Sequence, residues 1–200
     1  MQAFVFGFTL GFSLILAIGA QNAFVLKQGL KQQHVFLVCL ICAVSDAALI
    51  LIGVSGFHLM VLAFPGLTRF ALIGGAVFLT VYGAISFYNA FKSKQGLEPS
   101  EIRAGSWVQA ALTCLAFTWL NPHVYLDTMV LIGSVSTRFE TDIVYFTSGA
   151  IISSFVFFFS LGYGARLLRP LFAKPRAWRI LDFLIGCVMW AIALRLVFLP

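Results

Sequence analysis

The chain has 200 residues, of which 61% are hydrophobic and only 10% are charged, and its formal net charge is +6. This composition excludes an ordinary soluble globular domain, because so apolar a chain cannot have water as its main solvent. The length leaves room for one compact domain, which we expect to span residues 1–200.

Six apolar runs follow one another along the chain, and each is long enough to cross a hydrocarbon layer of about 30 Å. They are Ala3–Leu26, Val35–Phe57, Phe70–Phe91, Val108–Ile132, Ile143–Ala165 and Ile180–Phe198. A helix satisfies its own backbone hydrogen bonds in lipid, whereas an unpaired strand does not, and no alternation over about ten residues indicates a barrel. The sequence therefore predicts an all-α integral membrane protein with about six transmembrane helices.

The first run contains a polar interruption at Gly19–Asn22. Asn22 fits the N-cap of a short half-helix that ends near Gly29, so helix one is a candidate for a break beside Gln21. Polar residues close to the membrane surface would explain the same sequence, and this alternative remains open.

The second run has Asp46 near its centre, where an ionised carboxylate costs at least about 2.5–3.5 kcal/mol to insert. A structural hydrogen bond from a neighbouring helix would offset this cost, but we favour a substrate or proton site. Residues at helical spacing from Asp46 are small, which allows close helix approach. We interpret Cys39 and Cys42 among them as core packing, with a thiol redox or metal motif as the alternative.

The fourth run contains Asn121 followed by Pro122. Pro122 lacks an N–H and clashes with the carbonyl of Thr118, so the helix should kink or break there. The pair also fits the N-cap and first position of a new half-helix, whose electropositive N-terminus attracts an anion such as the carboxylate of an amino acid. On an unbroken helix Asp127 would point roughly 120° away from Asn121, so only a break brings them together. A structural kink alone remains the alternative.

A weak internal sequence repeat links these two interruptions, because Gln21–Lys27 resembles Asn121–Asp127, which lies one hundred positions later. This repeat suggests two three-helix halves of opposite orientation, with helices one and four interrupted. Inverted repeats of this kind place a transport site where the broken helices meet near the bilayer midplane.

Basic residues gather in the first, third and fifth connections between the runs. Ten of the thirteen are there: Lys27, Lys31, Lys92, Lys94, Arg103, Arg166, Arg169, Lys174, Arg176 and Arg179. Because Lys and Arg are retained in the cytoplasm, we expect these connections to be cytoplasmic and both termini to be outside. Short basic tracts between apolar runs set the membrane topology and do not form one exposed basic face, so no nucleic-acid partner is expected. Asp182 and Arg195 lie near the two ends of run six and are interpreted as interfacial.

Several of these segments resemble the LysE/ArgO family of bacterial basic amino acid exporters, and the resemblance covers nearly the whole chain. It is carried by Gly19–Gly29, Ser45–Asp46, Thr118–Thr128 and Gly186–Trp190. It implies an inner-membrane carrier that moves L-arginine or L-lysine outward, with Asp46 and Asp127 in the transport path. The family often has Pro where this chain has Ala20, which weakens the case for a break in helix one.

The resemblance and the residues together lead to one mechanism. Asp46 and Asp127 would balance the cationic side chain, while the half-helix end and Asn121 would receive the α-carboxylate. Exporting a cation against an inside-negative potential costs about 2.3 kcal/mol per charge at 100 mV, which exchange for a proton cancels. Asp46 is the better candidate for the proton carrier, because burial disfavours its ionised form and a cationic substrate favours it. The full set of expected transport residues is Gln21, Asn22, Asp46, Asn121, Pro122, Tyr125 and Asp127.

The expected partners are L-arginine, L-lysine, protons and membrane lipid, and assembly into a homo-oligomer is left open. We expect no enzymatic activity, no cofactor and no metal site. The alternatives are export of another small solute, such as homoserine, threonine or a metal cation, and a membrane thiol electron carrier that uses Cys39 and Cys42.

Overall fold

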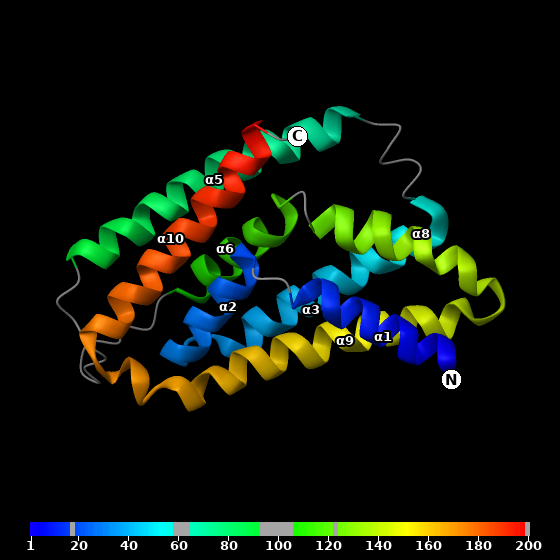
Figure 1. The fold of residues 1–200 in the computed structure, drawn as a ribbon, viewed down its shortest axis with the longest axis horizontal. Helices are drawn as coiled ribbons and strands as arrows, with labels where there is room; N and C mark the ends of the chain where they lie inside the picture. Colours follow the sequence, from blue (N-terminus) through cyan, green and yellow to red (C-terminus); the bar gives the residue numbers. More distant parts are fainter. Residues whose placement is uncertain (17–18, 58–64, 93–105, 122–123, 199–200) are drawn as a thin grey trace.

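The computed structural model describes residues 1–16, 19–57, 65–92, 106–121 and 124–198, and all regular secondary structure in these ranges is helical (Figure 1). The all-α prediction is confirmed. The longer helices are α1 (Gln2–Ile15), α2 (Ala20–Lys31), α3 (Val35–Ile52), α5 (Pro65–Lys92), α6 (Trp107–Trp119), α9 (Ile143–Gly164) and α10 (Pro175–Phe198). The shorter ones are the π-helices η1 (Gly53–Phe57) and η2 (Tyr125–Leu131), α8 (Ile132–Ser136), and the 3-10 helices η3 (Thr137–Asp142), η4 (Ala165–Leu168) and η5 (Leu171–Ala173).

Three helical stretches of the described chain are long and apolar enough to cross a membrane by themselves. They are Val35–Ser55, Ile143–Leu168 and Pro175–Leu194. The bent pair of α1 and α2 makes a fourth if it counts as one span, while Ala76–Phe91 and α6 are shorter apolar helices. Several spans are therefore present, and the number six stays a prediction.

The first apolar run is divided into α1 and α2, whose axes make an angle of 83°. The side-chain amide of Asn22 donates a hydrogen bond of 2.7 Å to the carbonyl of Ile15, at the end of α1. The predicted break is thus confirmed despite Ala20. Its details differ from the prediction, because Gly19 rather than Asn22 is the N-cap, and α2 continues beyond Gly29 to Lys31.

The fourth run is also divided, because α6 ends at Trp119 and η2 begins at Tyr125. The hydroxyl of Tyr125 donates a hydrogen bond of 2.8 Å to the carbonyl of Trp119, so a side chain bridges this break as Asn22 bridges the first. The carbonyl of Asn121 accepts a hydrogen bond of 3.1 Å from the backbone N–H of Val124, which is already helical, and the N-cap at Asn121 stays a prediction. Pro122 lies outside the described residues.

Two glycine contacts repeat between the halves of the chain. A Cβ added to Gly29 of α2 would meet the carbonyl oxygen of Gly162 in α9, and one added to Gly133 of α8 would meet that of Gly53 in η1. In both places the second part of a broken helix approaches a long helix of the other half with backbone against backbone. Only glycine allows this approach.

A reciprocal pair of contacts joins α5 and α10, which run side by side in Figure 1. Gly83 of α5 faces the ring of Trp190, and Gly186 of α10 faces the ring of Phe87. Each helix therefore offers a glycine to an aromatic ring of the other, in antiparallel order. Such reciprocity is the packing expected of inverted repeats, with α5 and α10 as corresponding helices.

Candidate functional site

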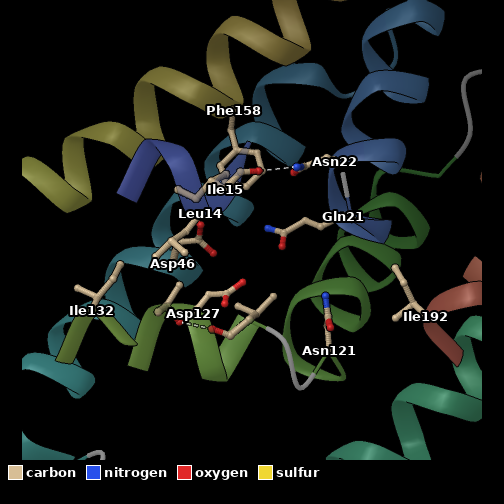
Figure 2. Close-up of a pocket in the computed structure, with 13 residues that line it drawn as sticks. Leu14, Ile15, Gln21, Asn22, Asp46, Asn121, Asp127, Ile132, Phe158 and Ile192 are labelled. Carbon is tan, nitrogen blue, oxygen red and sulfur yellow. Dashed lines mark hydrogen bonds between the residues drawn. The ribbon is translucent and has the colours of Figure 1, made fainter. Parts of the chain in front are cut away.

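A cavity of about 230 Å³ lies where the two helix breaks meet (Figure 2). We call it the central cavity. Its polar lining comes from both halves of the chain and its walls are apolar side chains and Phe158. The lining residues are Leu14, Ile15, Gly19, Gln21, Asn22, Asp46, Asn121, Val124, Asp127, Thr128, Ile132, Phe158 and Ile192. The structure therefore brings together five of the seven residues that the sequence singled out.

Asp46 enters the central cavity from α3 and is only 3% exposed. The hydroxyl of Ser154 in α9 donates a hydrogen bond of 3.2 Å to Oδ2. The other carboxylate oxygen, Oδ1, is buried and has no hydrogen-bond partner in the described part of the chain, and the same holds for Nε2 of Gln21. A buried polar atom without a partner costs about 1–3 kcal/mol, so this pair of atoms favours binding of a proton or a ligand.

Figure 2 shows that the amide of Gln21 and the carboxylate of Asp127 point toward the same space as Asp46. Asp127 is half-buried on η2. A π-helix within an otherwise α-helical span often marks a functional site, because its extra residue per turn redirects side chains. The described lining includes two acidic and no basic side chains, so the central cavity attracts cations.

The N-terminus of α2 adds the opposite polarity to the same cavity. Gly19, its N-cap, lines the cavity and supplies no side-chain cap. The first N–H groups of a helix have no intrahelical acceptor, and the helix dipole makes that end electropositive. Asn121, which is buried, lies across the cavity from α2 in Figure 2. The cavity lining thus combines two carboxylates with an electropositive helix end.

Two of the predicted residues stand apart from this lining. Tyr125 is not a lining residue, and its hydroxyl bonds to Trp119 while its ring packs on the Trp119 ring at a centroid distance of 6.4 Å. Pro122 cannot be assigned because it lies outside the described residues. Ser154, by contrast, was missed by sequence reasoning, and a hydroxyl in the centre of run five was the available signal.

Asp182 differs from its prediction as an interfacial residue. It is buried in α10 and forms an ion pair with Lys27 of α2. The sequence could not reveal this contact because the partners are 155 positions apart. The pair ties the second half of broken helix one to α10.

The buried cysteines also have specific partners. The thiol of Cys39 donates to the carbonyl of Phe158 at 3.1 Å, and Cys42 contacts the sulfur of Cys114 at 3.2 Å. Cys39 and Cys42 thus each have a partner on another helix. No group of three or more metal-binding side chains occurs within the described residues.

Comparison with known proteins identifies a family and relatives that this chain resembles. Residues 12–199 match the protein family described as LysE type translocator. The arginine exporter protein ArgO of Escherichia coli is 41% identical over 192 residues, which is 95% of this chain and 90% of that protein. A Mycobacterium tuberculosis protein whose name proposes an amino-acid transporter is 44% identical over 182 residues, 90% of each chain. No solved structure matches this chain.

Proposed function

Because the chain belongs to the family of LysE type translocators, we propose that it exports basic L-amino acids from the cytoplasm, with arginine as the main substrate and lysine as the second. It is a multi-pass protein of the inner membrane. The proposal depends chiefly on one observation: the central cavity combines two acidic side chains with a helix N-terminus and no basic residue among its described lining. The substrate named for the ArgO relative agrees with it.

The two ends of an arginine molecule suit different parts of the central cavity. The guanidinium would lie between Asp46 and Asp127, because its N–H donors match carboxylate oxygens, including the one on Asp46 without a partner in the described chain. The α-carboxylate would lie between Asn121 and the N-terminus of α2, where N–H groups favour an anion. Gln21 would supply a further donor.

Export would be coupled to inward movement of a proton carried by Asp46. An incoming proton cancels the electrical cost of moving a cation outward, about 2.3 kcal/mol per charge at 100 mV. Because burial disfavours the ionised carboxylate and a bound cation favours it, the proton and arginine would occupy Asp46 in alternation. The hydrogen bond from Ser154 would hold the carboxylate in place in both states.

The helix ends that carry the basic residues would face the cytoplasm, which leaves both termini outside. The end of α2, the end of α9 and the start of α10 lie on one side of the molecule in Figure 1, which supports this orientation. Lys31 of α2 lies 6.0 Å from the centre of the Trp178 ring in α10, so these ends are in contact. Both halves contribute to one cavity, as expected of a single transporter domain over residues 1–200.

The test is efflux of labelled arginine from proteoliposomes that contain the purified protein. We expect saturable efflux that accelerates when the outside is made more acidic and loses this acceleration when a protonophore removes the pH gradient. Unlabelled arginine and lysine should compete, whereas homoserine, threonine and divalent cations should not. Competition by those solutes but not by arginine would show that another solute is exported. Arginine efflux that does not respond to the pH gradient would remove the proton from the mechanism.

A further inference from the structure

A second cavity, of about 210 Å³, lies at the basic ends of the helices, and we call it the basic cavity. Lys27, Gln28 and Lys31 of α2 line it, together with Gln109 and Thr113 of α6. Residues of α2 line both the central and the basic cavity, but no lining residue is common to the two.

An aromatic cluster adjoins the basic cavity, because its Phe24 and Tyr82 rings line that cavity, and none of its rings lines the central cavity. Phe117 is at its centre and is buried, with ring centroids 5.3 Å from Phe24, 4.8 Å from Phe78 and 4.7 Å from Tyr82. The four rings come from α2, α5 and α6 and contact one another mostly edge to face, which is a favourable aromatic geometry. Phe78 and Phe117 line neither cavity.

The order of residues along the helices places this cluster on a single path. Along α2, Gln21 lines the central cavity, Phe24 belongs to the cluster, and Lys27 lines the basic cavity. Along α6 and the residues that follow it, Thr113 lines the basic cavity, Phe117 is in the cluster and Asn121 lines the central cavity. In both segments the cluster residue lies between the residues that line the two cavities, so the order along the chain is cavity, ring, cavity.

The ion pair between Lys27 and Asp182 holds α2 against α10 beside this cluster. Its side chains are only 12% and 9% exposed, so water screens their attraction weakly. α2 is separated from α1 by the helix break, so the ion pair to α10 is one of the contacts that fix its position. Release of the ion pair would let Phe24 withdraw from Phe117.

We propose that Phe24, Phe78, Tyr82 and Phe117 form the cytoplasmic gate of the carrier, closed in this structure, with the Lys27–Asp182 ion pair as its latch. The basic cavity then lies on the cytoplasmic side of this gate, and the central cavity lies on its other side. This inference rests on the proposed function for the direction of transport and the substrate, but the gate itself can be tested without any transport measurement.

The test is the rate at which a small, membrane-impermeant methanethiosulfonate labels single cysteines in inside-out vesicles. In a background without native cysteines, Val124→Cys reports the central cavity and Thr113→Cys reports the basic cavity. We expect Thr113→Cys to label readily and Val124→Cys slowly. Asp182→Asn or Phe24→Ala should accelerate labelling of Val124→Cys by about tenfold, because a buried ion pair or ring contact is lost, and leave Thr113→Cys unchanged.

Reversing the ion pair, with Lys27→Asp and Asp182→Lys together, should restore slow labelling of Val124→Cys and so distinguishes a latch from general loosening. If Val124→Cys and Thr113→Cys were labelled at equal rates in a protein that keeps Lys27, Asp182 and Phe24, the gate would be overturned. Unchanged Val124→Cys labelling in Asp182→Asn and Phe24→Ala, with Thr113→Cys still reactive, would do the same. A protein that shows the expected labelling but no arginine efflux would keep the gate and lose the proposed substrate.

Discussion

Asp46 and Asp182 are both buried aspartates, but the surroundings of their carboxylates differ. Asp182 is 6% exposed and is paired with Lys27 at the basic end of the molecule. Asp46 is 3% exposed, receives one hydrogen bond from Ser154, and keeps one buried oxygen without a partner in the described chain. Burial alone therefore does not identify a residue in a transport path.

The difference shows which of the two carboxylates can exchange ligands. An ion pair within the protein already balances Asp182, and adding a cation there means displacing Lys27. The charge of Asp46 has no cation from the described chain beside it, so a proton or a cationic substrate is the group that can balance it. A carrier needs a carboxylate of the Asp46 type in its central cavity, whereas a paired carboxylate such as Asp182 holds helices together.

The largest expected effect separates the two aspartates directly. Asp46→Asn should lower arginine export by about a hundredfold or more at every pH, because it removes the buried charge that binds both proton and substrate. The double variant Lys27→Gln with Asp182→Asn removes both charges of the ion pair and should keep export within about tenfold of the wild type. Efflux from proteoliposomes, normalised to inserted protein, measures both.

The control for this comparison is Asp142→Asn, which removes an exposed carboxylate and should leave export unchanged. If Asp46→Asn retained full export driven by a pH gradient, Asp46 would not be the proton carrier. If the double variant were as inactive as Asp46→Asn while well inserted, the distinction between the two aspartates would be wrong.

A second prediction concerns the packing that brings Asp46 and Asp127 to one cavity. Gly53 follows the helix of Asp46, and a Cβ there would meet the backbone of Met129 in η2. Gly53→Leu should force η2 away from α3 and reduce export roughly tenfold or more, because overpacking of this kind costs about 1–3 kcal/mol. Gly164→Leu is the matched control, since nothing lies within 4 Å of a Cβ at that position. Equal export by the two variants would contradict close packing of η1 on η2.

A smaller effect is expected at Asp127, which is only half-buried. Asp127→Asn should raise the KM for arginine by about tenfold, the value of one charge-assisted hydrogen bond, with a smaller change in the maximal rate. Asp127→Glu should recover part of the loss because it restores the charge. Initial rates of arginine efflux over a range of internal concentrations give both parameters. An unchanged KM in Asp127→Asn would place the residue outside the substrate site.

The all-helical fold and the positions of both helix breaks could be predicted from sequence because their causes are local. Hydropathy requires helices in lipid, and the interruption at Gly19–Asn22 is visible in the sequence itself. Asn121 and Asp127 could be expected to meet only if helix four broke, and the break is present. One capping detail was wrong, because Gly19 holds the N-cap position assigned to Asn22, whereas the N-cap at Asn121 stays a prediction.

Contacts between distant helices could not be predicted in the same way. The bond from Ser154 to Asp46 joins positions 108 apart, and the partner of Asp182 depends on how α2 leans on α10 after the first break. Asp182 lies near the start of an apolar run, so hydropathy alone suggested the membrane surface. Only the packed arrangement of α2 and α10 reveals that it is buried.

The smallest effect on export is expected from replacing the cysteines. The criterion is the one that separates Asp182 from Asp46, namely whether the side chain has a partner within the protein. Cys39 donates to Phe158, while Cys42 and Cys114 contact each other, so each buried thiol has a partner within the protein, as Asp182 does. By that criterion they are packing residues. Replacing Cys39, Cys42 and Cys114 with Ala and the exposed Cys187 with Ser should reduce stability but leave arginine export per inserted molecule within about twofold, because Ala keeps the core apolar. A thiol electron carrier would lose its activity completely in this variant. A well-inserted but inactive cysteine-free protein would therefore support the electron carrier and show that the cysteines do more than pack the core.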